Sequence, residues 1–131
     1  MLAALLLPSG VSSAYSGIAA TPPMGWRNWN AFQGHIDQPT MHAQMAALTA
    51  RTRRVVGLEE LSSLADAGYA RAGLDDNWQA CGAGVGGSFH DGATGAPLVN
   101  ASRFPDMKAM VDYGHSLGLK VGWYDNNWCV V

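Results

Sequence analysis

The chain reads Thr21-Pro22-Pro23-Met24-Gly25-Trp26-Arg27-Asn28-Trp29-Asn30 near its start and Gly73-Leu74-Asp75-Asp76-Asn77-Trp78 further along. In both stretches a short apolar run ends in indole and polar side chains. A flat indole face stacks on the C–H face of a pyranose ring, and carboxylates accept hydrogen bonds from ring hydroxyls. The two stretches together therefore indicate a sugar-binding site.

The sequence around these stretches alternates short apolar strands with helices. Strands are expected at 24–26, 69–75 and 119–124, and helices at 41–56, 58–67 and 105–117. The order β-α-β-α-β, with helix-length crossovers, predicts an α/β fold with a parallel sheet and right-handed connections. Between 79 and 98 lie six of the 16 glycines without a period, which predicts a long loop.

Capping residues and apolar spacing support the helices. Asp37 and Thr40 are N-cap candidates around Pro39, and Pro105 suits the first position of the later helix. The positions expected to face inward are Met41, Met45, Leu48, Leu61, Leu64 and Ala65, then Met107, Met110, Val111, Gly114 and Leu117. Gly68 and Gly118 are expected to end the helices that precede them.

The chemistry-bearing residues gather at one end of this predicted sheet. Functional side chains of parallel α/β sheets lie just past the carboxyl ends of the strands. The residues expected there are Trp29, Asp75, Asp76, Trp78, Tyr124 and Asp125. Consecutive residues leaving a strand point to opposite faces, so Asp75 and Asp76 are expected to bind hydroxyls and not to bracket one scissile bond. Trp123 is expected to serve packing, and packing or turn-capping roles stay open for the others.

Composition excludes several classes of protein. The 131 residues include 48% hydrophobic and 14% charged residues, with a net charge of −2, which describes one ordinary globular domain. A nucleic-acid surface is not expected, since the one dense basic cluster, at 51–54, fits a solvated helix face. No apolar run is long enough to span a membrane. No metal site or cofactor is expected, because His90-Asp91 reads as a solvated loop pair and no nucleotide motif is present.

Weak signals favour export. Residues 1–14 resemble a truncated signal peptide, with an apolar run but no basic start. Asn100-Ala101-Ser102 is a glycosylation sequon. Cys81 and Cys129 fit a disulfide with each other or with a residue outside this sequence, and the sequence does not choose between them.

Four ordered motifs resemble glycoside hydrolase family 27, the α-galactosidases and α-N-acetylgalactosaminidases. They are 21–30, 74–78, 103–110 and 115–124, and the resemblance runs from about Ala20 to Tyr124. It implies that 20–131 forms the first three β/α units, about a third, of a (β/α)₈ barrel. It also implies that Trp29, Asp75, Asp76 and Tyr124 contact a terminal galactose, with Trp78 and Asp125 as further candidates.

The same resemblance implies a retaining exo-glycosidase acting on terminal α-D-galactosyl residues, secreted or lysosomal/vacuolar. The two catalytic aspartates of that family follow its fourth and sixth strands, so none is expected in this chain, which alone is expected to be inactive. Arg27-Asn28 departs from the family pattern, and His35 and Asn77 stand where a family disulfide would be. Alternatives are a non-catalytic carbohydrate-binding fragment, a structural βαβ domain, or an α-N-acetylgalactosaminidase or β-L-arabinopyranosidase. The oligomeric state stays open.

Overall fold

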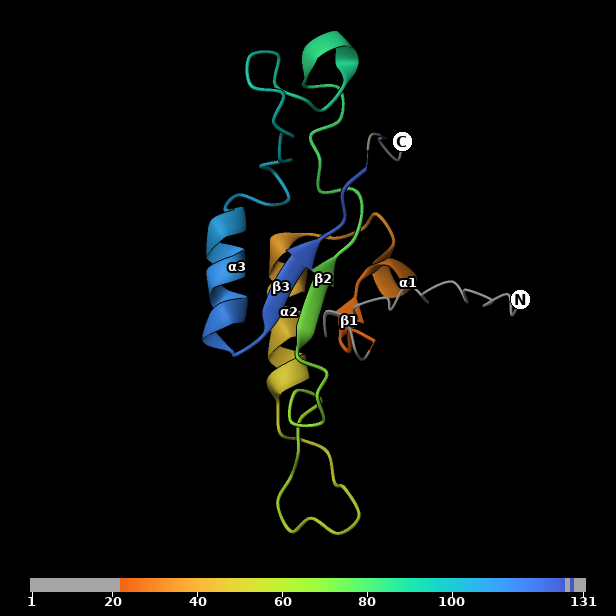
Figure 1. Ribbon diagram of the computed structural model, residues 1–131, viewed down its shortest axis with the longest axis vertical. Helices are drawn as coiled ribbons and strands as arrows, with labels where there is room; N and C mark the ends of the chain where they lie inside the picture. Colours follow the sequence, from red (N-terminus) through yellow and green to blue (C-terminus); the bar gives the residue numbers. More distant parts are fainter. Residues whose placement is uncertain (1–21, 127, 129–131) are drawn as a thin grey trace, which may run out of the picture.

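Three parallel strands form the centre of the structure, a computed structural model that describes residues 22–126 and 128 (Figure 1). The elements in chain order are β1 (Trp26–Arg27), α1 (Trp29–Phe32), α2 (Gln38–Thr49), β2 (Arg71–Leu74), the 3-10 helix η1 (Val85–Gly87), α3 (Met107–Ser116) and β3 (Lys120–Trp123). The sheet order is β1-β2-β3, with Trp26 opposite Ala72 and Ala72 opposite Val121. The prediction of a parallel α/β sheet is confirmed.

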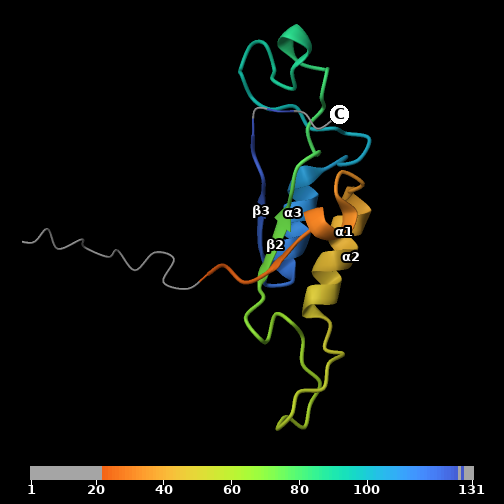
Figure 2. The same ribbon diagram turned by 90° about the vertical axis from the view of Figure 1, so that its right-hand side faces the viewer.

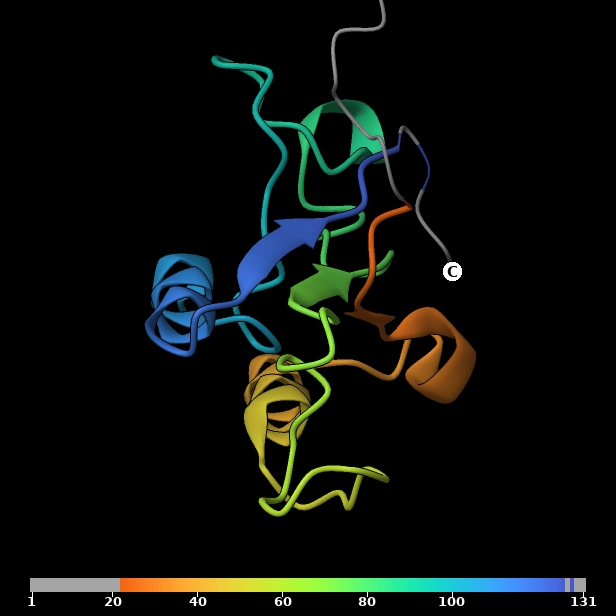
Figure 3. The same cartoon turned by 60° about the horizontal axis from the view of Figure 1, so that its bottom comes forward.

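The helices cover one face of this sheet. Seen along the sheet, α2 and α3 lie on the same side of the strands (Figures 2 and 3). Between them and the strands lies a core of buried apolar residues, which includes Met41, Met45, Leu48, Ala72, Leu74, Met110 and Leu119. The opposite face of the sheet carries the exposed strand residues Arg27, Arg71, Lys120 and Gly122. None of the described helices has the length and apolar character needed to cross a bilayer.

Helix α2 begins as the sequence predicts but ends earlier. Asp37 is its N-cap and accepts a hydrogen bond of 2.9 Å from the Thr40 amide, and Pro39 follows in the first turn. The helix ends at Thr49, so the prediction of helix to residue 56 was wrong. The four residues at the core, Gln38, Met41, Met45 and Leu48, all lie before that end. Residues 51–61 are exposed throughout, so no apolar face stabilises further turns there.

The predicted helix at 58–67 is also absent. The segment from 50 to 70 is an irregular excursion at the amino end of β2, held by an antiparallel bridge between Arg53 and Ser62 (Figure 1). Leu61, expected to face inward, is 44% exposed, and Gly68 has a φ of 94° in a turn and not after a helix. The apolar spacing suggested a helix, but Leu58 and Leu61 are exposed, so the packing that would stabilise one is missing there.

Helix α3 follows its predicted face with a shifted start. Asp106 is the N-cap and accepts from the Ala109 amide at 2.8 Å, so Pro105 precedes the cap instead of occupying the first helical turn. Met110 and Gly114 are buried against the core, as predicted. Gly118, with a φ of 75°, ends the helix and leads into β3. A left-handed residue at this place is a common helix terminator.

The predicted loop at 79–98 extends beyond the carboxyl ends of the strands (Figure 1). Apart from η1 it contains two isolated antiparallel bridges, Gln79 with Val99 and His90 with Pro97. Phe89 is 2% exposed, so the loop has a buried anchor of its own. Cys81 in this loop is disulfide-bonded, while Cys129 and the leader at 1–14 lie outside the described residues.

Candidate sugar-binding site

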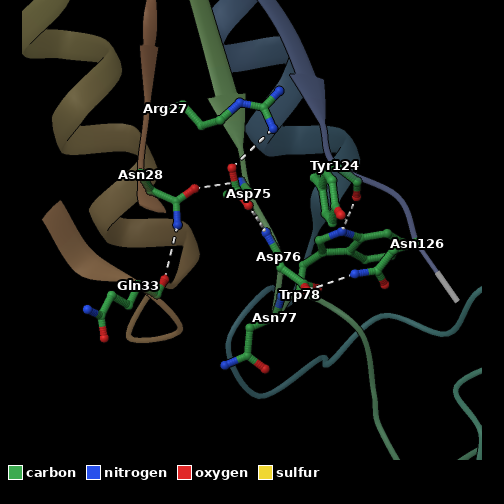
Figure 4. A network of polar contacts seen from close by, with 9 residues as sticks. All are labelled: Arg27, Asn28, Gln33, Asp75, Asp76, Asn77, Trp78, Tyr124 and Asn126. Atoms are coloured by element: carbon green, nitrogen blue, oxygen red, sulfur yellow. Dashed lines mark hydrogen bonds and ion pairs between the residues drawn. The ribbon is translucent and has the colours of Figure 1, made fainter. Parts of the chain in front are cut away.

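The carboxyl ends of the three strands bring distant parts of the sequence together. Asp75 and Asp76 follow β2 directly, and Tyr124 follows β3 and donates its backbone N–H to the Leu74 carbonyl at 2.8 Å. Asn28 follows β1 and is fully buried beside them. Figure 4 shows this group and the polar contacts that connect it. The predicted convergence of the strand ends is therefore present for Asp75, Asp76 and Tyr124.

Asp75 is fixed by three polar contacts. Its backbone N–H donates to Asn28 Oδ1 at 2.5 Å. Its Oδ1 accepts from the Asp76 amide at 2.9 Å, and its Oδ2 accepts from Arg27 Nη1 at 3.1 Å. The carboxylate is 16% exposed, so it is held in place and still reaches solvent. A carboxylate in this state is a preorganised acceptor for a hydroxyl.

Asp76 is held more tightly and faces another neighbour. Its side chain points toward the end of β3, where Asn126 Nδ2 donates to Asp76 Oδ2 at 2.9 Å (Figure 4). The other oxygen accepts from the Asn77 amide at 2.7 Å, and the residue is 5% exposed. Gln79 Nε2 in turn donates to Asn126 Oδ1 at 3.5 Å. The two aspartates therefore contact different strands, Asp75 the end of β1 and Asp76 the segment after β3.

The tryptophans divide between packing and exposure. Trp78 is 2% exposed, and its indole N–H donates to the Tyr124 carbonyl at 2.8 Å, which connects the segments after β2 and β3. Trp123 packs edge-on against Trp78 with 6.4 Å between ring centroids. It is nonetheless 46% exposed, which the packing role expected from the sequence did not anticipate. The Tyr124 ring is also exposed and lies beside Trp78 (Figure 4).

Trp29 and Asp125 lie at the margin of this group. Trp29 is the first residue of α1 and half-buried, immediately after Asn28. Asp125 is exposed and follows Tyr124. Asn100 is half-buried, and its Oδ1 accepts from the Ser102 hydroxyl at 2.6 Å. Contact of Trp29 or Asp125 with a ligand, and glycosylation of Asn100, stay predictions.

A second polar cluster supports the turn after Asp76. Asn77 has a φ of 73°, and its side-chain amide donates to the Gly34 carbonyl at 2.9 Å. Arg103 donates to the same carbonyl at 2.9 Å and to Asn77 Oδ1 at 3.1 Å. The cluster joins the α1–α2 loop to the turn after β2. These are the two segments that the disulfide implied by the family resemblance would link. His35, the other residue at that pair of positions, is exposed.

Sequence reasoning missed the residues that hold the two aspartates. Arg27 and Asn28 contact Asp75, and Asn126 contacts Asp76. Arg103, also missed, supports the turn after Asp76 through Asn77. A signal existed for Arg27 and Asn28, which stand out as departures between the opening tryptophans. Arg103 and Asn126 gave no local signal, because their partners are 26 and 50 residues away in the sequence. Among the described residues, no three His, Cys, Asp or Glu side chains are grouped to hold a metal ion.

Residues 21–129 match the family model described as alpha galactosidase A. The chain belongs to the alpha-galactosidase family. The alpha-galactosidase of Cyamopsis tetragonoloba is 32% identical over 114 residues, a match that covers 86% of this chain and 23% of that protein. The chain thus spans about a quarter of the length of this relative.

Solved alpha-galactosidase structures share the fold. Alpha-galactosidase I from Mortierella vinacea superposes with a TM-score of 0.59 at 31% identity, covering 85% of this chain and 23% of that one. The Saccharomyces cerevisiae enzyme, solved with raffinose, superposes with a TM-score of 0.60 at 27% identity, covering 88% and 21%. The three-stranded sheet is therefore a fraction of an alpha-galactosidase TIM barrel, which confirms the fold expected from the sequence.

Proposed function

We propose that this chain supplies the galactose-recognition part of a glycoside hydrolase that removes terminal α-D-galactosyl residues. Asp75 is the central acceptor for a ring hydroxyl, Asp76 and Tyr124 line the same edge, and Trp29 offers an aromatic face. The observation that carries the proposal is the preorganised Asp75 carboxylate, held by Arg27, Asn28 and the Asp76 amide while still open to solvent. Family membership supports the choice of galactose.

Recognition suits the two aspartates better than acid–base catalysis. Retaining hydrolysis needs two carboxyl groups about 5–5.5 Å apart that flank one glycosidic bond. Asp75 faces Arg27 and Asp76 faces Asn126, so the pair does not present two carboxylates to one point (Figure 4). The nucleophile and the acid/base therefore come from outside these residues, and the chain alone does not hydrolyse galactosides.

The location and the substrates proposed for the whole protein rest on the same family membership. We infer an exported or vacuolar glycosidase that acts on α-galactosides of small molecules or oligosaccharides. The sequon at Asn100 agrees with export, and the Ser102 hydroxyl that a glycosylation sequon requires lies against the Asn100 amide.

Binding of methyl α-D-galactopyranoside to the purified chain, followed by two-dimensional NMR, tests this proposal. The wild-type chain should bind the galactoside and should bind methyl α-D-glucopyranoside, its C4 epimer, more weakly. Asp75→Asn should weaken galactoside binding by about tenfold, because it replaces a charged acceptor with a neutral amide. Asp112→Asn, on the exposed side of α3, is the matched control. Equal affinity for both sugars, or no loss in Asp75→Asn, would overturn the proposal.

A further inference from the structure

Arg27 is the last residue of β1 and lies on the face of the sheet that the helices leave open. Its guanidinium reaches across to β2, where Nη1 donates to Asp75 Oδ2 at 3.1 Å (Figure 4). The side chain is 51% exposed. An ion pair at this exposure contributes little to stability. Because the ion pair adds little stability, its position next to a carboxylate proposed to bind sugar points to a role in binding.

Gly73 leaves the space through which the Arg27 side chain crosses the sheet. It is the residue of β2 opposite Arg27 in the parallel register. A Cβ atom at Gly73 would lie 3.2 Å from Arg27 Nε and 3.5 Å from Cζ, so any larger residue would displace the guanidinium. The backbone of Gly73 does not need glycine, since its φ is outside the left-handed region. Space for Arg27 is what the glycine provides.

The pairing leaves hydrogen-bonding capacity on both partners. Asp75 Oδ1 accepts from the Asp76 amide and Oδ2 accepts from Arg27, and each oxygen keeps a second lone pair. Oδ2 is the one beside the guanidinium. A guanidinium carries five N–H donors, and the contact with Asp75 uses one of them. A sugar hydroxyl both donates and accepts. A charged acceptor beside a charged donor is therefore complementary to one hydroxyl group.

We propose that Arg27 and Asp75 form one hydroxyl-binding pair, in which a single galactose hydroxyl donates to Asp75 Oδ2 and accepts from the Arg27 guanidinium. Arg27 is then a specificity-determining residue, and Gly73 positions it. The inference rests on the proposed function, because it names how the same site holds its sugar. It adds a direct sugar contact at a position where this chain departs from the family pattern.

The test compares galactoside affinity of the wild-type 131-residue chain with that of four variants, by NMR titration with methyl α-D-galactopyranoside. Arg27→Met keeps the length and removes the donors, so the dissociation constant should rise about tenfold or more. Arg27→Lys should recover part of the affinity, since an ammonium donates without the planar fork. Gly73→Ala should weaken binding with Arg27 intact. Arg71→Met, at the amino end of β2 on the same open face, should bind like wild type.

The outcomes separate this inference from the proposed function. Unchanged affinity in Arg27→Met, or an equal loss in Arg71→Met, would overturn the pair while galactose recognition stands. Absence of galactoside binding by the wild type would overturn the proposed function and the pair with it. If Arg27→Met gives the amide spectrum of an unfolded chain, Arg27→Lys and Gly73→Ala decide. Wild-type affinity in both of these would contradict the role of the guanidinium.

Discussion

Asn28 joins the end of β1 to the end of β2 through a single buried side chain. Its Oδ1 accepts from the Asp75 amide, and its Nδ2 donates to the Gln33 carbonyl at 3.3 Å, with the residue at 0% exposure. Asn28→Ala removes the partners of the part-buried Asp75 N–H and Gln33 carbonyl, so the free energy of unfolding should fall by about 1–3 kcal/mol. Urea denaturation measures it. Asn30→Ala, an exposed neighbour, is the control, and an equal loss there would contradict the role of Asn28.

At the level of residues, the sequence predicted where the two aspartates lie but not the side chains that hold them. Asp75, Asp76 and Tyr124 were predictable because strand ends collect functional groups and the motifs around them are local. Arg27 and Asn126 were not, because a side chain that crosses to another strand depends on register and on the space left by residues such as Gly73. The exposure of Trp123 was missed for a similar reason. The sequence around each tryptophan does not show which of those that meet at the strand ends is buried.

Helix α2 depends on its N-cap, whose contribution varies with pH. The hydrogen bonds from Thr40 hold the pKa of Asp37 below its ordinary value of 3.8. A depressed folded-state pKa gives stability that is present above the unfolded value and is lost as the pH falls through the folded value. Asp37→Asn keeps a capping side chain without the titration. The wild type should therefore lose stability relative to Asp37→Asn below about pH 3.8 in urea denaturation. A difference that stays constant from pH 7 to pH 3 would contradict this account.

Helix α3 approaches β3 closely at Gly114. A Cβ atom there would lie 2.3 Å from Val121 Cγ2 and 3.1 Å from Met45 Sδ. Gly114→Ala should lower the free energy of unfolding by about 1–3 kcal/mol, because the core must shift to admit a methyl group. Gly122→Ala is the matched control, since a Cβ atom at Gly122 would meet no atom of the described residues within 4 Å. Thermal unfolding of both variants distinguishes overpacking from a general cost of replacing glycine.

Among the elements, those anchored in the core were predicted and those outside it were not. The apolar positions Met41, Met45, Leu48 and Met110 follow the helical period and are buried. The segment from 50 to 70 carries a similar apolar spacing, yet Val55, Val56, Leu58 and Leu61 are exposed there. Helices in proteins gain most of their stability from packing, and a periodic sequence without a surface to pack against does not form one.

At the scale of the whole molecule, the sheet formed by the described residues has open sides. In the part of the chain that the structure describes, β1 and β3 each pair only with β2, and the face opposite the helices is uncovered. Under the proposed function, the rest of a glycosidase barrel would close this sheet and supply the catalytic carboxylates. The 131-residue chain should therefore show no turnover of p-nitrophenyl α-D-galactopyranoside above the buffer rate, even where it binds galactose. Turnover that Asp75→Asn and Asp76→Asn abolish would show instead that these aspartates are catalytic.

A map of where the chain binds galactose tests the proposed site at the strand ends. Backbone amide resonances assigned by NMR would be followed during titration with methyl α-D-galactopyranoside. We expect the shifts to concentrate at the carboxyl ends of the strands, at Arg27, Asn28, Asp75, Asp76 and Tyr124. Shifts confined to other parts of the molecule, such as residues 50–70, or no shifts at high sugar concentration would contradict it.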